Sequence, residues 1–174
     1  MIFLKSVDST QKKLKTLKQP ENGMIVIADN QTAGIGTHER MWYTGYGRNI
    51  AMSFILMPDC PIKKMQNFTV CIAETMAKVL KKITKLDIQI KMPNDLFLSG
   101  KKIGGILTES SCKGEIVKKI YVGIGLNVNQ EEFPGNLDEI ATSLKKETGT
   151  ENKREDIVVA FLNAFEKEYL KLIY

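Results

Sequence analysis

The sequence predicts an α+β fold: a mixed, largely antiparallel β-sheet with helices packed on one face. Three observations predict it. Two continuous apolar runs of strand length lie in the first third, four β-prone segments follow one another in the middle, and two longer segments carry apolar residues at helical spacing. The 174 residues, 43% of them hydrophobic and 26% charged, fit one domain over 1–174. A domain of this size buries roughly 70% of its unfolded surface, enough for a sizeable core.

The first third should contain a short helix and two strands. Ser9 or Thr10 can cap the helix, and leucines recur along it at helical spacing. The stretch from Gln31 to Arg48 is long for a connection between strands, and long loops in compact domains are usually functional or mobile. The expected elements are a helix at 8–18 and strands at 24–28 and 50–57.

The rest of the chain should form a long helix, an antiparallel meander and a final helix. Apolar residues recur every three or four positions from Lys63 to Lys85, which indicates a helix packed on one face. The same spacing returns from Ile157 to Leu172. Lys113 and Gly114 can form the turn of a hairpin between the last two strands. The strands are expected at 88–92, 96–98, 102–111 and 116–128.

Charge and composition exclude several classes of partner. The net charge of +5 comes mainly from lysine doublets dispersed along the chain, a pattern typical of solvated faces, so we expect no nucleic-acid partner. No stretch approaches the ~20 apolar residues that span a bilayer, and the N-terminal apolar run is too short for a signal peptide. We therefore expect a cytoplasmic protein without a membrane partner. No His/Cys cluster has metal-ligand spacing, so any divalent ion would be held by carboxylate and phosphate oxygens.

A glycine-bearing loop from Gln31 to Trp42 is the first candidate site. Gly34 and Gly36 would let the backbone approach a ligand closely, and His38 and Arg40 add hydrogen-bonding or positive groups. No regular helix pattern begins after these glycines and no GK[ST] follows, so neither a dinucleotide-binding fold nor a P-loop is indicated.

The segment KMPNDLFLSGKKIGG, from Lys91 to Gly105, is the second candidate. Asn94 and Asp95 follow a proline at the end of a strand, and a lysine lies about seven residues further on, so a carboxylate and an ammonium could face one pocket. Its paired glycines are costly inside a strand unless something lies against the bare backbone. These residues alone fit a ligand pocket and a surface hairpin equally well.

Gly123 to Asn129 repeats the pattern at a strand end, with small residues followed by carboxamides. Three such patches point to one extended ligand site lined by backbone. The single histidine has no identifiable acid partner, so no Ser-His-Asp set can be argued.

Taken together, these segments resemble the catalytic domain of biotin protein ligases, in order and spacing. The most specific part is K-x-P-N-D followed by K-[IL]-x-G-I-L-x-E. The resemblance covers nearly the whole chain and implies the biotin–lipoate ligase catalytic fold, which is similar to class II aminoacyl-tRNA synthetases. The segments are Asp8 to Thr10, Gln31 to Trp42, Lys91 to Asp95, Lys102 to Glu109 and Gly123 to Asn129.

The resemblance implies an ATP-dependent ligase. Biotin and MgATP would give biotinyl-5′-adenylate and pyrophosphate, and a lysine of the biotin carboxyl carrier domain of a carboxylase would then take the biotin and release AMP. The first step requires positive charge against a carboxylate and a phosphate, and preorganised electrostatics is the usual main source of such acceleration.

The resemblance also implies roles for individual residues. Lys102 would be the main catalytic group, with Arg40 near phosphate and Asp95 assisting Mg²⁺. Trp42 would cap the site by packing on the closed loop, or serve as a core anchor. The expected binding residues are Ser9, Thr10 and Gln31 for the biotin ureido group; Gly34, Ile35, Gly36, Thr37 and His38 in the loop over the adenylate; Gly104, Gly105 and Gly123 beside the ligand; and Lys91, Asn94 and Asn127 for the nucleotide side and the pocket wall.

The loop departs from the pattern G-R-G-R-x-G-R that is frequent in the family. Ile35 and Thr37 stand at arginine positions and Glu39 at a glycine position. We therefore expect the adenylate to be retained less tightly than by an arginine-rich loop. We also expect a single catalytic domain, without an N-terminal helix-turn-helix or a C-terminal β-barrel domain.

Two alternatives share much of this evidence. One is a lipoate or octanoate ligase or transferase of the same fold, although a transferase needs a catalytic cysteine facing a lysine and Cys112 is poorly placed for that. The other is a biotin or nucleotide binder without catalytic activity. The sequence fits a monomer or a homodimer equally well.

Overall fold

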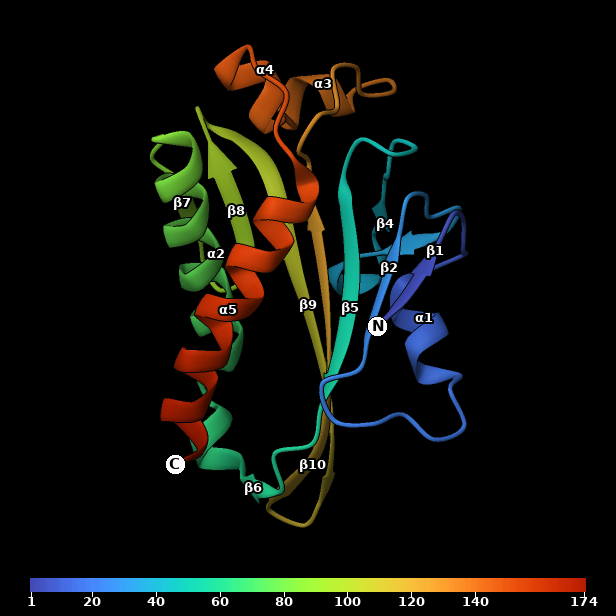
Figure 1. Cartoon of the computed structure of the whole chain (residues 1–174), viewed down its shortest axis with the longest axis vertical. Helices are drawn as coiled ribbons and strands as arrows, with labels where there is room; N and C mark the ends of the chain where they lie inside the picture. Colours follow the sequence, from blue (N-terminus) through green and yellow to red (C-terminus); the bar gives the residue numbers. More distant parts are fainter.

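The computed structural model describes residues 1–174 and contains one large sheet. Its strands follow the order β1-β2-β5-β10-β9-β8-β7, and β6 pairs with β10 (Figure 1). Only β1 and β2 pair in parallel, so the sheet is mixed and largely antiparallel, as predicted. The strands are β1 (Ile2–Leu4), β2 (Ile25–Ala28), β5 (Ile50–Leu56), β6 (Cys60–Pro61), β7 (Gln89–Lys91), β8 (Asp95–Leu98), β9 (Lys101–Lys113) and β10 (Ile116–Leu126).

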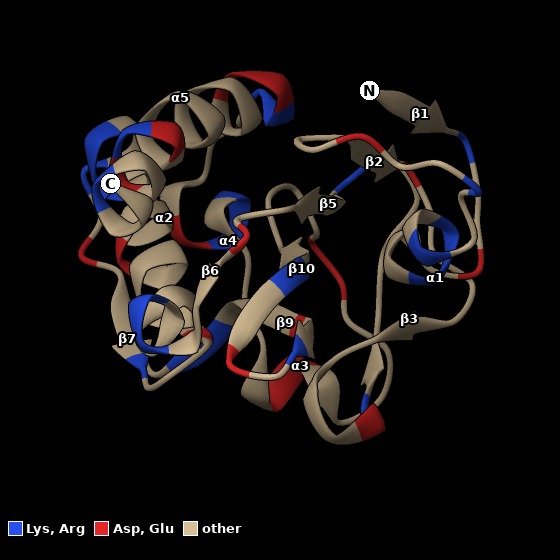
Figure 2. Cartoon of the chain, turned by 90° about the horizontal axis from the view of Figure 1, so that it is seen from below, with Lys and Arg blue, Asp and Glu red and all other residues tan.

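Two long helices, α2 (Phe68–Thr84) and α5 (Arg154–Ile173), cover one face of the sheet (Figure 1). Their apolar stripes pack on the strands and on each other, and Phe161 and Phe165 of α5 stack with their ring centroids 5.6 Å apart. The short helix α1 (Thr10–Lys15) packs Leu14 against Val26 and Ile55 on the opposite face (Figure 2). The predicted α+β class is confirmed, but the expectation of helices on one face is corrected, because α1 packs on the other face from the two long helices.

Side-chain alternation divides the sheet into an apolar face and a small-residue face. Along β10, Val122, Ile124 and Leu126 point into the core beneath α2 and α5. Gly123 and Gly125 lie between them and therefore face the other way, because successive strand residues point to opposite sides. The open face above these glycines is the one on which a ligand can lie close to the backbone.

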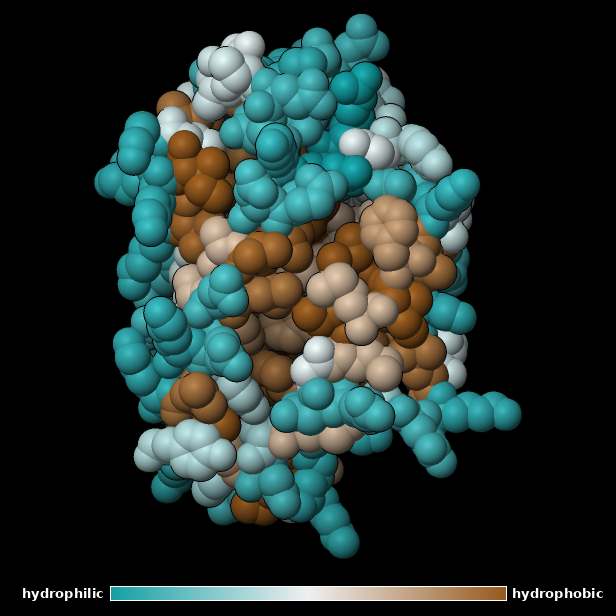
Figure 3. Space-filling model, in the orientation of Figure 1, coloured by the Kyte–Doolittle hydropathy of each residue, from teal (hydrophilic) through white to brown (hydrophobic).

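The helix-covered face keeps a groove of ≈ 500 Å³ beside α5. Apolar side chains gather over this part of the surface in Figure 3. Its apolar lining comes from Ile25, Phe54, Leu56, Leu162, Phe165, Tyr169 and Leu170.

The predicted strands and long helices are confirmed, with several corrections. β1 was not expected, because a three-residue edge strand carries no measurable periodicity. The helix expected from Lys63 begins at Phe68, after a 3₁₀ turn at Ile62–Met65. Two short helices, α3 (Leu137–Ile140) and α4 (Leu144–Thr148), were also not expected. No helix has the length and apolarity needed to cross a membrane.

The long loop between β2 and β5 contains short regular elements. It holds the two-residue strands β3 (Gly34–Ile35) and β4 (Met41–Trp42), joined by a 3₁₀ turn at Thr37–Glu39. This small hairpin pairs Gly34 with Trp42 and lies over the open face of the main sheet. The chain thus places the Gln31 to Trp42 segment above the glycines of β9 and β10.

Candidate active site

The floor of the site is a row of small residues on neighbouring strands. Gly125 of β10 lies opposite Ala51 of β5 and Gly105 of β9, and Gly105 lies opposite Asp95 of β8. One step along, Gly123 lies opposite Ser53. Residues in cross-strand register lie side by side on one face, so these small groups make a continuous shallow channel across three strands.

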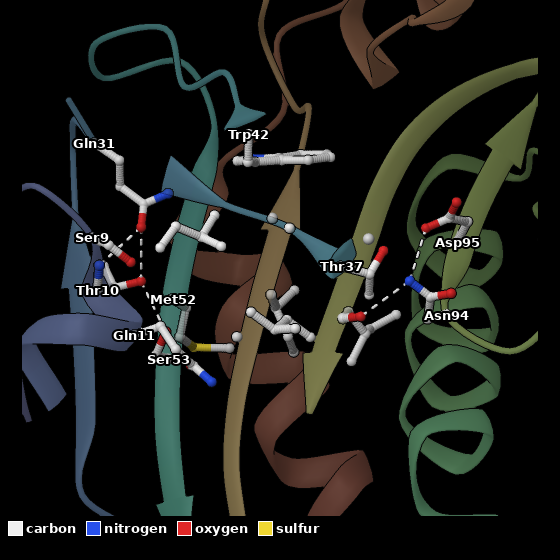
Figure 4. Close-up of a pocket in the computed structure, with 18 of the residues that line it drawn as sticks. Ser9, Thr10, Gln11, Gln31, Thr37, Trp42, Met52, Ser53, Asn94 and Asp95 are labelled. Carbon is white, nitrogen blue, oxygen red and sulfur yellow. Dashed lines mark hydrogen bonds between the residues drawn. The ribbon is translucent and has the colours of Figure 1, made fainter. Parts of the chain in front are cut away.

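An inner cavity of ≈ 40 Å³ lies along this channel, and its end beside α1 is rich in hydroxyl and amide groups (Figure 4). The oxygen Oε1 of Gln31 accepts hydrogen bonds from the backbone N and the Oγ1 of Thr10, at 2.9 and 3.0 Å. The Thr10 hydroxyl also bonds the Ser53 hydroxyl at 2.8 Å. Helix α1 begins here, with Ser9 as its N-cap, so the cap positions these polar groups against the sheet.

Gln11 is a site residue that the sequence analysis missed. Its side chain is buried, at 5% exposure, and lines the inner cavity. Its Nε2 donates to Glu109 Oε2 at 2.9 Å and to the Tyr121 carbonyl at 3.3 Å, whereas its Oε1 is buried without a partner. The only sequence signal was its place directly after Ser9 and Thr10, because a glutamine in a short helix usually faces solvent.

Glu109 is ionised at neutral pH. Partial burial favours its protonated form, but hydrogen bonds from Lys15 and Gln11 outweigh this effect and hold the pKa of the carboxyl below its usual value. The Lys15 ammonium lies 2.6 Å from Glu109 Oε2. A charged acceptor therefore faces the amide of Gln11.

Lys102 and Asp95 meet above Gly105 at the middle of the channel. The Lys102 Nζ lies 2.8 Å from Asp95 Oδ1, and Asn94 Nδ2 donates to the same oxygen at 3.0 Å. A side-chain carbon on Gly105 would lie 3.5 Å from both Asp95 Oδ1 and Lys102 Nζ, so both groups stand directly over the glycine. An ammonium is thereby held, half-buried, beside the path of any ligand that follows the channel.

Trp42 covers the channel beside Lys102. Its indole lies so close to Gly125 that a Cβ there would come within 2.3 Å of Trp42 Cε2. The Lys102 Nζ lies 5.7 Å from the centre of the ring, within cation–π range. The indole therefore lies over the channel, and its role as a cap stays a prediction.

An outer cavity of ≈ 460 Å³ opens on the far side of Trp42 and Lys102. Lys102, Lys91 and Arg40 bring positive charge to it, and its Asn127 has a buried Oδ1 without a partner. Asp95 is the one carboxylate among the residues lining either cavity. The wall is otherwise mainly apolar, with Met41, Tyr43, Phe97, Phe133, Leu137, Ile140 and Ala141.

The turn of the loop contains two residues in left-handed backbone conformation. His38 has φ 56° and Glu39 has φ 58°. Left-handed geometry is strained for residues with a Cβ and free of that strain for glycine. Glu39, which stands at the position where the ligase pattern has glycine, therefore carries local strain.

Glu39→Gly should remove this strain without changing the cavity linings. Because the same replacement makes the unfolded chain more flexible, we expect a net change in the free energy of unfolding within about 1 kcal/mol. Chemical denaturation measures the free energy of unfolding of Glu39→Gly relative to the wild type. Gly36→Ala is the comparison, because Gly36 is not in the left-handed region. If Glu39→Gly lowered the free energy of unfolding by several kcal/mol, Glu39 would not be a strained residue in the wild type.

Most of the predicted residues line one of the two cavities, and three do not. At Gly34 an added Cβ would lie 2.5 Å from the Trp42 carbonyl oxygen, so packing within the loop requires glycine there. His38 is exposed and lines neither cavity. Gly104 points toward Leu96 and Leu126 in the core, because adjacent strand residues face opposite sides. The residues that do line a cavity are Ser9, Thr10, Gln31, Ile35, Gly36, Thr37, Trp42, Asn94, Asp95, Lys102, Gly105 and Gly123 in the inner one, and Arg40, Lys91 and Asn127 in the outer one.

The sheet, the capping loop and the channel with its central lysine define the class of protein, a catalytic domain of the biotin–lipoate ligase type. The chain belongs to the biotin/lipoate A/B protein ligase family, whose sequence model matches residues 3–127.

Individual relatives agree with this assignment. The chain is 38% identical over 174 residues to "Bifunctional ligase/repressor BirA" of Bacillus spizizenii, covering 97% of this chain and 53% of that one. It is 32% identical over 169 residues to "Biotin--[acetyl-CoA-carboxylase] ligase" of Paracoccus denitrificans, covering 94% of this chain and 70% of that one. The chain therefore spans about half the length of the first of these relatives.

A solved structure agrees as well. The biotin protein ligase from Aquifex aeolicus, in complex with biotin and ATP, superposes with a TM-score of 0.84 at 32% identity. The match covers 95% of this chain and 68% of that one.

Proposed function

We propose that this chain activates biotin with ATP to biotinyl-5′-AMP and transfers the biotin to a lysine of a carboxylase's biotin carrier domain. In the first reaction a biotin carboxylate oxygen bonds the α-phosphorus of ATP and pyrophosphate leaves. In the second, the carrier's lysine amine bonds the carbonyl carbon of the mixed anhydride, loses a proton and releases AMP. The names of the relatives from Paracoccus and Aquifex support both the ligand and the reaction.

One observation carries the proposal: a polar inner cavity and a cationic outer cavity meet at Lys102. The hydroxyl and amide groups of the inner end can hydrogen-bond a bicyclic urea, and its acyl chain can follow the glycine floor toward Lys102. A nucleotide fits the outer cavity, with phosphates beside Lys102, Lys91 and Arg40. Carboxylate and α-phosphate would then meet at the junction, where the ammonium of Lys102 opposes their mutual repulsion.

Asp95 positions that ammonium. Its carboxylate is fixed by Asn94 and holds Lys102 Nζ over Gly105, which restricts a flexible side chain to one place before the ligands arrive. Trp42 covers the junction from the loop side and would exclude water from the mixed anhydride.

Mg²⁺ would be held mainly by ATP. No group of three or more His, Cys, Asp or Glu side chains converges as a metal site. Asp95, at the junction, can add one carboxylate to the phosphate oxygens, a donor set that suits Mg²⁺. The ion would supply charge neutralisation on the phosphates.

A three-part assay tests the function. The protein is incubated with MgATP, labelled biotin or lipoate, and a biotin carrier domain, and both the acyl-adenylate and the labelled carrier are measured. We expect biotinyl-5′-AMP and biotinylated carrier. Adenylate without labelled carrier would contradict the transfer step, lipoyl products would favour the lipoate alternative, and ligand binding without adenylate would favour the non-catalytic binder.

Adenylate retention should depend on the loop. Ile35 and Thr37 line the inner cavity without offering a charge to the phosphate, and Arg40 lies beside the outer one. We expect Thr37→Arg to slow release of biotinyl-5′-AMP about tenfold, since one charge-assisted hydrogen bond contributes roughly 1.5–3 kcal/mol. Rapid-dilution measurements of adenylate release check it. Thr32→Arg, at an exposed loop position that lines neither cavity, is the control, and equal release from both variants would contradict the prediction.

A further inference from the structure

Lys15, Glu109 and Gln11 form a chain of contacts, and Gln11 lines the inner cavity. Lys15 lies on α1 four residues after Gln11, so both side chains leave the same face of the helix. Both reach Glu109 Oε2, Lys15 Nζ at 2.6 Å and Gln11 Nε2 at 2.9 Å. Glu109 lies opposite Tyr121 in the β9–β10 ladder, and the Tyr121 ring lies 5.7 Å from the Lys15 ammonium.

This arrangement fixes the orientation of the Gln11 amide. Its outer side faces two acceptors, the Glu109 carboxylate and the Tyr121 carbonyl, and only the NH₂ group can satisfy them. The reversed amide would place its oxygen against a negative charge. Gln11 Oε1 must therefore point inward over Gly123, where it lies 3.1 Å from the Cβ position of that glycine.

The inward oxygen has no partner, although the side chain is only 5% exposed. A buried acceptor left unpaired is unfavourable, so this position favours a ligand that brings a hydrogen-bond donor. The urea N–H groups of biotin are such donors. The dithiolane ring of lipoate has none.

We propose that Glu109 and Lys15 are positioning residues that lock Gln11 with its oxygen toward the ligand, and that this lock selects a ring bearing an N–H donor. The proposal rests on the proposed function and adds the feature by which the site distinguishes a cyclic urea from a dithiolane. Lys15 keeps the Glu109 carboxylate charged and in place, Glu109 holds the NH₂ group, and Gln11 makes the contact.

Glu109→Met tests the lock, because methionine has a similar volume and no acceptor oxygen. We expect the Kd for biotin, measured by calorimetry on the full chain, to rise about tenfold, the equivalent of one hydrogen bond. The rate of adenylate formation at saturating biotin should stay unchanged. Glu109→Gln, which restores an acceptor without the charge, should give an intermediate Kd.

A double-variant comparison separates positioning from a general structural effect. In a Gln11→Ala background, Glu109→Met should cause no further change in the Kd for biotin. Glu168→Met is the matched control, because Glu168 is similarly exposed (41% against 43%) and pairs with Lys171 at 2.9 Å on α5. That control should bind biotin as the wild type does. Thermal unfolding of each variant shows that it is folded.

The outcomes distinguish the two proposals. Wild-type affinity in Glu109→Met, or multiplicative effects of Glu109→Met and Gln11→Ala, would overturn the positioning role and leave the proposed function standing. A wild-type protein that binds lipoate as tightly as biotin would overturn the selection by Gln11. A wild-type protein that binds no biotin would overturn both proposals.

Discussion

Lys102→Ala should reduce biotinyl-5′-AMP formation by about a hundred- to a thousandfold, the usual effect of removing one preorganised group that stabilises developing charge. Lys102 is the cation common to both cavities, and its Nζ is held over the channel by Asp95. Without it, the carboxylate and the α-phosphate would approach one another with no opposing charge at the junction. Single-turnover formation of the adenylate, followed by quenching and mass spectrometry, measures the loss.

The neighbouring lysine provides the control. Lys101 lies one residue earlier, and its Nζ donates to the Asp138 carbonyl at 2.8 Å, away from both cavities. Lys101→Ala should retain the wild-type rate of adenylate formation. A wild-type rate in Lys102→Ala would show that the assignment of this lysine is wrong.

Gly125→Ala should lower the rate of adenylate formation about a hundredfold, because a displacement of about 1 Å at a reacting site can cost that much. The added methyl group would come within 2.3 Å of Trp42 Cε2 and 2.5 Å of Trp42 Nε1, so the indole has to move off the floor. Its displacement would open the junction to water and narrow the channel.

A second substitution tests this explanation. Trp42→Ala removes the indole atoms Cε2 and Nε1 that the methyl group would meet, so Gly125→Ala should cost less in that background than alone. Thermal unfolding monitors the fold of each variant. An equal fall in the rate of adenylate formation in both backgrounds would show that Gly125→Ala does not act through its contact with Trp42.

Local patterns predicted the sheet and the centre of the site well. The glycines of β10 alternate with large apolar residues, and this alternation is enough to place Gly123 on a bare face once the strand is recognised. The pairing of Asp95 with Lys102 was predictable because both lie in one short hairpin, β8 to β9, in which the two strands are close in the sequence. Both inferences depend on residues within one strand or between adjacent strands.

The parts that were missed depend on register and on distant packing. The sequence predicts both Gly104 and Gly105 beside the ligand. Adjacent strand residues face opposite sides of the sheet, so only one of the two can face the channel, and that residue is Gly105. A register shift between Leu96 and Phe97 helps to decide which one, and a linear sequence does not display it. Gln11 becomes a site residue only because α1 packs on the open face beside Glu109, 98 positions away.

The outer cavity was the least predictable part of the site. Phe133, Leu137 and Ile140 form much of its apolar wall, and they lie in a segment of irregular backbone and one short helix. Apolar residues with so little periodicity give no indication of which surface they cover. Their place was decided by contacts with β9, including the isolated bridge between Lys102 and Ala141.

If biotin carboxylate and the α-phosphate of ATP react at Lys102, labelled pyrophosphate should exchange into ATP in the absence of any carrier protein. We expect exchange that requires both Mg²⁺ and biotin, with lipoate unable to replace biotin. Lys102→Ala should lower the exchange rate by about the same hundred- to thousandfold, and Lys101→Ala should leave it unchanged. Absence of exchange in wild-type protein saturated with biotin, or exchange supported by lipoate in place of biotin, would contradict this reaction of biotin at Lys102.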